Sequence, residues 1–296
     1  MNPTVLDISD LHVAITARGH TVPLLRGVGL TIAPGEVRGL VGESGAGKSM
    51  IARSIFGLLP GGARITRGRV LFDDRDLATM AEAERRVLLG ARIALIPQDP
   101  MTSLNPVKRI GEQIGIVLRL KMGMERKAAR ERAIDLLAEV AIREPKRVID
   151  LYPHELSGGM RQRILIAMAF SCTPRLVIAD EPTTALDVTV QRQILRLNHD
   201  LQHRHGAAVL FVTHNFGLVA KLCQSVTVLY AGRVVEQGTT VDVLSSPREA
   251  YTRALLAATP RLDRPAEALA PLPRSLIDTL IAEAHAYDAA NGAAYR

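Results

Sequence analysis

The sequence has little cysteine, few aromatic residues and no long apolar run. Its two cysteines, Cys172 and Cys223, show neither a CxxC nor a Cys/His zinc spacing, which argues against a disulfide framework and a zinc site. The longest apolar runs, such as residues 164–170, are far shorter than the ~20 residues of a membrane-spanning helix. We therefore expect two reduced, buried cysteines and a chain that does not itself cross a membrane.

Charge and aromatic content bear on nucleic-acid binding. The net charge of +7 would suit a polyanionic partner, but the basic residues are scattered along the chain. Aromatic residues make up 3% of the sequence, which leaves almost no platform for stacking single-stranded bases. We therefore predict no nucleic-acid partner.

Short apolar runs alternate with helical stretches, a pattern typical of an α/β fold with a largely parallel sheet. The first forty residues are rich in predicted strands. Later strands are predicted at residues 175–180, 207–214 and 225–232, each nearly continuously apolar, as expected where both faces are covered. A helix is predicted from Lys48 to about Leu59, where Pro60 and two glycines follow.

Two stretches differ in texture from this core. Residues 110–151 are helical and charged, with Ile134, Leu137 and Ala141 at helical spacing, and we interpret them as part of an inserted helical subdomain. Residues after Pro260 are rich in alanine and proline, which predicts a loosely attached extension over residues 261–296. Within the α/β core itself, residues 189–205 predict an amphipathic helix that ends at Gly206.

The strongest chemical motif lies between a predicted strand and a predicted helix, and it matches G-x-x-x-x-G-K-[ST] without a gap. Its glycines let backbone N–H groups converge on phosphate oxygens, and the helix adds its positive end. Lys48 would reach the β- and γ-phosphates, and the Ser49 hydroxyl would ligate Mg²⁺. The predicted ATP-binding residues of this segment are Gly42, Glu43, Ser44, Gly45, Ala46, Gly47, Lys48, Ser49 and Met50.

A second motif, LVIADEP, ends a predicted strand with two acids. Asp180 can hold Mg²⁺ through water, and Glu181 can order and polarise an attacking water molecule. Two adjacent acids at the end of a strand are common, so this motif indicates a magnesium site only in combination with the phosphate-binding motif at residues 42–49.

A third motif, LSGGMRQR, places a serine and two glycines ahead of an apolar helical run, which forms a second anion site by the same physics. One nucleotide does not need two such sites in one chain, whereas two chains facing head to tail do. We therefore predict that each phosphate loop is closed by the other chain. The predicted residues of this trans site are Leu156, Ser157, Gly158, Gly159, Met160 and Gln162.

Together these motifs resemble the nucleotide-binding subunit of ATP-binding cassette (ABC) transporters over about residues 5–260. The resemblance implies an α/β fold with a P-loop (RecA-like) ATPase core, an N-terminal antiparallel β subdomain and a helical subdomain inserted at about residues 100–165. It further implies that Gln98 contacts Mg²⁺ as the Q-loop glutamine and that His214 is the switch histidine at the γ-phosphate. Asp187, with Ala185 and Leu186, resembles the D-loop at the dimer interface.

Three longer stretches, residues 98–107, 180–195 and 246–260, resemble the ATPases of oligopeptide, dipeptide and nickel importers. That resemblance implies a second, different ATPase subunit, two membrane permease subunits and an extracytoplasmic solute-binding protein. It places the chain at the cytoplasmic face of the inner membrane as a peripheral subunit. Some relatives carry a cysteine-rich iron–sulfur segment near the C-terminus, but no cysteine follows Cys223, so we predict no cluster.

One feature departs from the family pattern. Many cassettes stack an aromatic residue on adenine, whereas this chain has His20, Thr21 and Val22 in that neighbourhood.

The main prediction is a transport-coupled ATP hydrolase that imports dipeptides or oligopeptides. The alternatives are an importer of nickel or a metal chelate, a soluble non-transport ABC ATPase, and a catalytically silent partner in a heterodimer.

Overall fold

The structure is a computed structural model that describes residues 4–17, 19–183, 187–258 and 273–295. The chain divides into two compact units, of which the first comprises residues 1–80 and 210–296 and the second residues 81–209. The strand β8 (Ala208–Thr213) contains the point where the chain passes from the second unit to the first.

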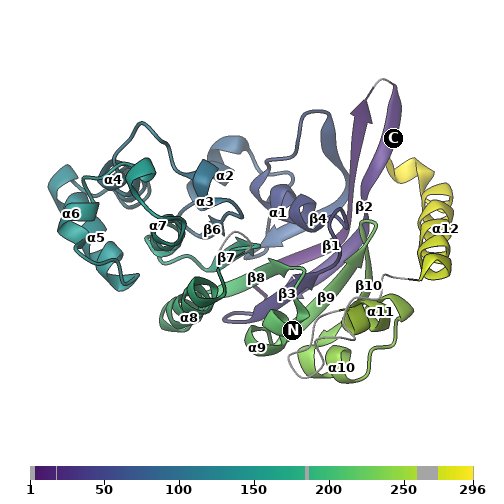
Figure 1. Cartoon of the computed structure of the whole chain (residues 1–296). Helices are drawn as coiled ribbons and strands as arrows, with labels where there is room; N and C mark the ends of the chain where they lie inside the picture. The colour runs from purple at the N-terminus through teal and green to yellow at the C-terminus, as the bar shows by residue number, and fades with distance from the viewer. Residues whose placement is uncertain (1–3, 18, 184–186, 259–272, 296) are drawn as a thin grey trace. The chain divides into compact units, whose positions relative to one another are not determined.

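The first unit contains an antiparallel sheet, whose strands are shown in purple and blue in Figure 1. Its strands are β1 (Leu6–Ala17), β2 (His20–Ile32), β4 (Ala63–Phe72) and β5 (Arg75–Asp76), in the order β2-β1-β4-β5. Leu6 pairs with Ile32 on one side and with Phe72 on the other, and all three side chains are buried. This sheet confirms the predicted N-terminal antiparallel β subdomain.

The first unit also contains strands of a mixed sheet. In it, β3 (Val37–Val41) runs parallel to β9 (Ser225–Tyr230), which pairs with the antiparallel β10 (Arg233–Thr239). The helices α1 (Lys48–Phe56), α9 (Phe216–Leu222) and α10 (Thr240–Ser245) belong to the same unit. Because Gly57 adopts a left-handed conformation, α1 ends three residues before the predicted end at Leu59.

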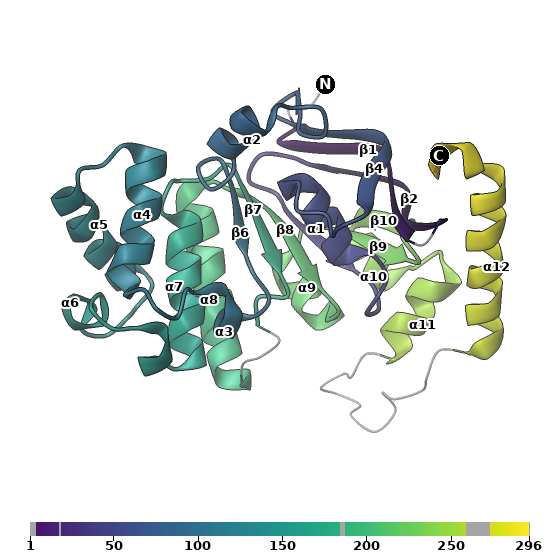
Figure 2. The ribbon, with the colours of Figure 1, turned by 90° about the horizontal axis from the view of Figure 1, so that it is seen from above.

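In the second unit, two parallel strands, β6 (Ile93–Ile96) and β7 (Leu176–Asp180), are accompanied by helices. Figure 2 shows α7 (Gly158–Phe170) running beside α8 (Val188–His205). The remaining elements are α2 (Glu82–Leu88), α3 (Pro100–Ser103), α4 (Ile110–Met122), α5 (Arg126–Glu139), α6 (Pro145–Val148) and η1 (Pro153–Glu155).

The helix predictions for this unit were correct in position but not in every detail. Helix α8 ends at the left-handed Gly206, as predicted. In α5, Leu137 is buried, whereas Ile134 is half-buried and Ala141 is exposed beyond the helix end. The stripe toward the interior instead consists of Ala129, Ala133, Leu136 and Leu137, because α5 packs against both α4 and α7.

The C-terminal segment, comprising α11 (Ala250–Ala258), α12 (Arg274–Ala290) and η2 (Gly292–Tyr295), belongs to the first unit. Figures 1 and 2 both show α12 alongside the antiparallel sheet. Leu280 and Ala284 are buried, and Asp288 forms an ion pair with Arg26 of β2. The loose attachment predicted from composition is therefore wrong for residues 274–295, since specific side-chain contacts hold them.

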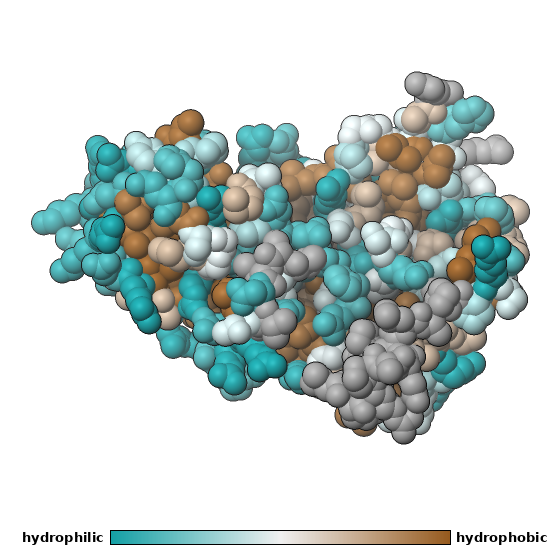
Figure 3. All heavy atoms as spheres, in the orientation of Figure 1, coloured by the Kyte–Doolittle hydropathy of each residue, from teal (hydrophilic) through white to brown (hydrophobic). Residues whose placement is uncertain are grey.

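The burial of the two cysteines matches the expectation from the sequence. Both cysteines are buried, and burial raises the pKa of the Cys223 thiol to about 12. Among the described residues, every helix is too short or too polar to span a bilayer. Hydrophobic residues interrupt the hydrophilic surface over α4 to α6 at the left of Figure 3, and α4 exposes Ile116, Leu120 and Met122.

Candidate functional site

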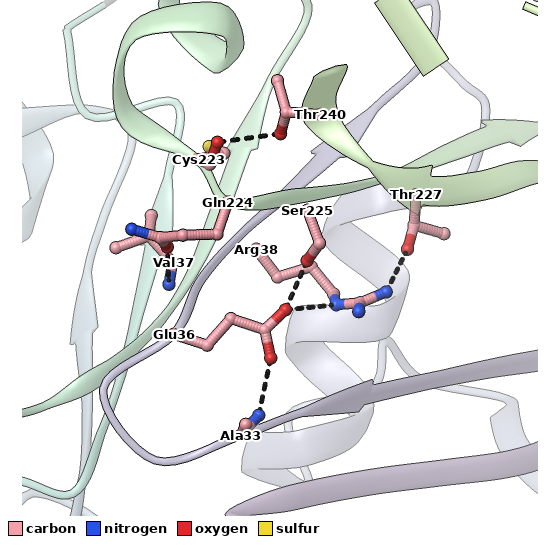
Figure 4. Close-up of polar contacts among 9 residues, drawn as sticks. All are labelled: Ala33, Glu36, Val37, Arg38, Cys223, Gln224, Ser225, Thr227 and Thr240. Atoms are coloured by element: carbon pink, nitrogen blue, oxygen red, sulfur yellow. Dashed lines mark hydrogen bonds and ion pairs between the residues drawn. The ribbon is translucent and has the colours of Figure 1, made fainter. Parts of the chain in front are cut away.

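The strand that leads into the phosphate loop is anchored at its start by a cluster around Glu36 (Figure 4). The Glu36 carboxylate accepts hydrogen bonds from the Ala33 N–H at 2.7 Å, from Arg38 Nε at 3.2 Å and from the Ser225 hydroxyl. Arg38 Nη1 also donates to Thr227 Oγ1 at 3.3 Å. Because Arg38 pairs in register with Ser225, these contacts fix β3 against β9 just before the loop.

Residues 42–49, the nucleotide loop, follow β3 directly and fold around their own lysine. Lys48 is 6% exposed, and its Nζ donates hydrogen bonds to the carbonyl oxygens of Gly42 at 2.8 Å and Glu43 at 2.9 Å. A Cβ at Gly42 would lie 2.2 Å from the Leu229 carbonyl oxygen of β9. Only glycine therefore allows the loop to begin this close to the neighbouring strand.

The loop ends on the N-terminus of α1. Its N-cap residue is Gly47, which is left-handed at φ 104° and makes no side-chain capping bond. Ser49 and Met50 lie in the first helical turn, while Glu43, Ser44 and Gly45 are exposed. Backbone amides, the positive end of the helix and the Lys48 ammonium together form a donor set that suits phosphate. The residues predicted to bind ATP in this segment thus form one continuous structural feature.

His214 and the residues considered for adenine also belong to the first unit. His214 is exposed one residue after β8, and the next residue, Asn215, caps α9 through the N–H of Leu218. His20, Thr21 and Val22 lie exposed at the start of β2, with Val22 at 52% exposure. No aromatic residue is present there, as the sequence indicates.

In the second unit, three of the predicted residues come together at the end of β7. Asp180 is the last residue of this strand, and Glu181 follows it with a left-handed φ of 44°. Gln98, two residues after β6, donates from Nε2 to Glu181 Oε2 at 3.3 Å. A left-handed, non-glycine residue at such a position is strained, and strain of this kind concentrates at functional sites. The oxygen ligands of Asp180 and Gln98 suit a hard divalent cation.

The serine–glycine motif forms the start of α7. Ser157 is the exposed N-cap residue, and its Oγ accepts a hydrogen bond from the Met160 N–H at 3.3 Å. Gly158, Gly159 and Met160 are half-buried in the first turn. Since a hydroxyl that accepts one hydrogen bond can still donate its own proton, Ser157 presents a donor at a positive helix end.

Two residues predicted for this trans site point away from the surface. Leu156 is 6% exposed and Gln162 is fully buried. Both polar atoms of the Gln162 amide lack a hydrogen-bond partner within the described part of the chain. Because both side chains are buried, residues 157–160 are the part of the predicted trans site that lies at the surface.

Asp187, predicted at a dimer interface, has a local role in the structure. It caps α8, because its Oδ1 accepts from the N–H groups of Thr189 at 3.0 Å and Val190 at 2.9 Å. Asp187 is exposed, which is compatible with an interface position. The two preceding residues, Ala185 and Leu186, lie outside the described residues.

Sequence reasoning missed one residue that touches the nucleotide loop. Tyr251 of α11 is 1% exposed, and its hydroxyl oxygen accepts a hydrogen bond from the Glu43 N–H at 3.3 Å. The surrounding stretch, residues 246–260, is recognisable as similar to peptide-importer ATPases, but neither spacing nor residue type indicates a contact with a loop two hundred positions earlier.

Comparison with family models gives two matches. The model described as "ABC transporter" matches residues 25–184, more than half of the chain. The model described as "Oligopeptide/dipeptide transporter, C-terminal region" matches residues 235–284, which include α10, α11 and most of α12.

Curated relatives align over most of their length. The dipeptide transport ATP-binding protein DppD of Bacillus subtilis is 46% identical over 269 residues, covering 90% of this chain and 80% of that protein. The probable D,D-dipeptide transport ATP-binding protein DdpD of Escherichia coli is 48% identical over 274 residues, covering 92% and 84%.

Solved structures agree with these matches. The ATP-binding cassette MJ0796, solved as a dimer in a post-hydrolysis state with ADP and Pi, superposes with a TM-score of 0.71 at 26% identity, over 79% of this chain and 98% of that one. The cbiO1 structure from Clostridium perfringens, part of the ABC transporter complex cbiONQ, gives 0.68 at 26% identity, over 82% and 91%. The chain therefore belongs to the ABC transporter family and is an ATP hydrolase of the cassette type.

Proposed function

We propose that this ABC-family chain binds ATP on the nucleotide loop and hydrolyses it to drive the import of dipeptides or oligopeptides through separate membrane subunits. The observation that carries the ATP site is the buried Lys48, which the loop's own carbonyls hold at the N-terminus of α1. The peptide substrate is supported by the relatives, several of which are named for dipeptide or oligopeptide transport.

Each residue has a distinct proposed role in hydrolysis. Lys48 and the amides of the loop stabilise the charge on the β- and γ-phosphates. Glu181 accepts the proton of the attacking water, and His214 hydrogen-bonds the γ-phosphate. Ser49, Gln98 and Asp180 supply hydroxyl, amide and carboxylate oxygens for Mg²⁺, which when bound would neutralise phosphate charge.

The start of α7 is proposed to complete the site of a second ATPase subunit. Ser157 is exposed and retains a proton to donate, so it can bind a phosphate that another chain holds. We propose a two-fold or pseudo-two-fold pair with a different ATPase chain, with Asp187 at the interface between the two.

The exposed apolar side chains of α4 support contact with membrane subunits. Ile116, Leu120 and Met122 share this helix, and Leu120 is 76% exposed. Large exposed apolar residues grouped on one element mark interaction surfaces. We propose that the helical subdomain meets two permease subunits, which receive substrate from an extracytoplasmic solute-binding protein. The chain would then be peripheral, at the cytoplasmic face of the inner membrane.

Reconstitution of the whole transporter in proteoliposomes tests this function. We expect Glu181→Gln to lower ATP hydrolysis by at least about 100-fold while ATP binding persists, since the general base alone is removed. Glu283→Gln, at an exposed position of α12, removes an equal charge and is expected to leave hydrolysis unchanged. Unaltered hydrolysis in Glu181→Gln would remove Glu181 from the role of general base.

The same proteoliposomes identify the class of substrate. With the solute-binding protein present, a mixture of dipeptides and oligopeptides is expected to stimulate ATP hydrolysis and to accumulate inside the vesicles. Nickel salts or metal chelates at equal concentration are expected to do neither. Stimulation by the metal and not by the peptides would overturn the assignment of a peptide importer and leave the ATP site in place.

A further inference from the structure

We infer that the C-terminal segment positions the nucleotide loop, with Tyr251 acting directly and Asp288 acting through Arg26. The inference rests on the proposed function, because it takes residues 42–49 as the place where ATP binds. It assigns a role to α11 and α12, which lie beyond residues 25–184, the part that the ABC transporter model matches. Tyr251 and Asp288 are positioning residues, since neither is placed to touch the reacting atoms.

The first contact joins α11 to the start of the loop. The Tyr251 hydroxyl oxygen accepts the Glu43 N–H at 3.3 Å, and the Tyr251 ring packs edge-on against Tyr230 with centroids 4.7 Å apart. A phenol is neutral at physiological pH, and burial raises the pKa of Tyr251 further, so its hydroxyl is even harder to ionise. The ring cannot swing away without opening a buried space.

This contact bears on Lys48 through a single peptide unit. The N–H of Glu43 and the carbonyl of Gly42 belong to the same peptide bond, which is planar. Tyr251 holds the N–H side of that plane, and Lys48 Nζ donates to its carbonyl side at 2.8 Å. The tyrosine therefore fixes the orientation of a carbonyl that in turn holds the phosphate-binding ammonium.

The second contact joins α12 to the end of the loop. Asp288 accepts two hydrogen bonds from Arg26, at 2.7 and 2.9 Å, and Arg26 Nη1 donates to the Ala231 carbonyl at 2.7 Å. The Arg26 N–H donates to the Gly232 carbonyl at 2.8 Å, and the Gly232 N–H donates to the Ala46 carbonyl at 2.8 Å. A hydrogen-bonded path thus runs from α12 through the turn between β9 and β10 to the loop.

Aromatic contacts hold α12 in the place where it can do this. The Tyr287 ring stacks with the buried His12 of β1 at 6.1 Å and lies under the Arg233 guanidinium at 4.8 Å. A Cβ at Gly27 would lie 2.3 Å from the Tyr287 hydroxyl, so the helix approaches β2 closely at this point. The helix is therefore bound to a defined place on the first unit.

A pair of variants on α11 tests the direct contact. Tyr251→Phe removes the hydroxyl that meets the loop and keeps the ring. Thr252→Val removes the hydroxyl of the next residue, which is fully buried and has no hydrogen-bond partner among the described residues. Both variants thus delete one buried hydroxyl from the same helix, and only one of the two hydroxyls touches the loop.

Two measurements on the full-length chain are compared for this pair. In Tyr251→Phe, amide hydrogen exchange of peptides covering residues 42–49 is expected to be about threefold to tenfold faster, because the Glu43 amide loses its partner. The affinity for ATP is expected to fall by about threefold to tenfold. Thr252→Val is expected to match the wild type in both.

The outcomes separate the possibilities. Equal exchange and equal affinity in Tyr251→Phe and the wild type would overturn the inference, as would equal losses in Tyr251→Phe and Thr252→Val, which would indicate general packing of α11. A wild-type chain that does not bind ATP would overturn the proposed function instead, and hydrogen exchange would then decide the inference alone.

A second pair, on α12, keeps the test decisive if Tyr251→Phe does not fold. Asp288→Asn removes the charge that orients Arg26, whereas Asp278→Asn removes an exposed charge from the same helix. We expect exchange in residues 42–49 to rise about twofold to fivefold in Asp288→Asn only. Identical amide hydrogen exchange of residues 42–49 in the two variants would show that Asp288 of α12 does not position the nucleotide loop.

Discussion

The nucleotide loop and the start of α7 are both helix N-termini rich in glycine, yet the chain treats them differently. At α1 the N-cap residue is Gly47, which makes no side-chain capping bond, and Lys48 is buried in the loop. At α7 the N-cap residue is Ser157, which caps the helix itself and remains exposed. The nucleotide loop thus holds a buried ammonium group, whereas the start of α7 exposes a hydroxyl group to solvent.

This difference indicates how one kind of physics can serve two tasks. Both helix ends favour an anion, because aligned peptide dipoles and amide N–H groups point at it. The loop adds a fixed ammonium and is held by the surrounding chain, which suits a site that binds its own ligand. The capped serine needs no support beyond its own helix, which suits a donor that completes a site on another chain.

The largest expected effect comes from removing the charge that distinguishes the loop. Lys48→Ala is expected to weaken ATP binding and to lower hydrolysis by at least about 100-fold, since one preorganised cation at the phosphates is lost. Equilibrium binding of ATP to the purified chain measures the first effect. Lys221→Ala, an exposed lysine in α9 of the same unit, is the matched control and should bind as the wild type. Normal binding in Lys48→Ala would remove the loop from the ATP site.

A glycine-to-alanine substitution in each region is expected to lower the free energy of unfolding by different amounts. In Gly42→Ala the new Cβ would lie 2.2 Å from a backbone carbonyl of β9, which cannot move without breaking the sheet, and we expect a loss of about 2–3 kcal/mol. In Gly159→Ala it would lie 2.9 Å from a side-chain methyl of Val190, which can shift, and we expect less than about 1.5 kcal/mol. Urea denaturation of the two variants measures the difference, and equal losses would contradict it.

Much of the fold could be predicted because its signals are local. The apolar strands that end at Asp180 and Tyr230 are continuous in sequence, and Gly206 terminates α8 by its own backbone conformation. The nucleotide loop and the helix after it are also one contiguous segment, so their joint placement follows from the motif. Helix ends and helix faces were less accurate, since Gly57 ended α1 early and the packing of α5 decided which side was buried.

The contacts that support the site could not be predicted, because they join residues far apart in the chain. Tyr251 meets Glu43 and Asp288 meets Arg26 across more than two hundred residues, and nothing in spacing or periodicity indicates such a pair. Composition predicted a loosely attached extension in the same region, because it is rich in alanine and proline. Helix α12 nevertheless makes specific side-chain contacts, such as that of Asp288 with Arg26. Glu181 was predicted from a local motif and Gln98 from the family resemblance, and neither indicated that the two side chains contact each other.

The smallest expected effect tests the outward-facing half of the comparison. Ser157→Ala removes both the cap of α7 and the exposed hydroxyl, and we expect a loss of about 1 kcal/mol in the free energy of unfolding. Ser157→Asn keeps a capping side chain, so its stability should match the wild type. ATP affinity of the isolated chain should be unchanged in both, because the serine is proposed to act on the nucleotide of the other subunit. Hydrolysis by the assembled transporter should fall in both variants, and a fall in Ser157→Ala alone would mean that Ser157 serves α7 only as a cap.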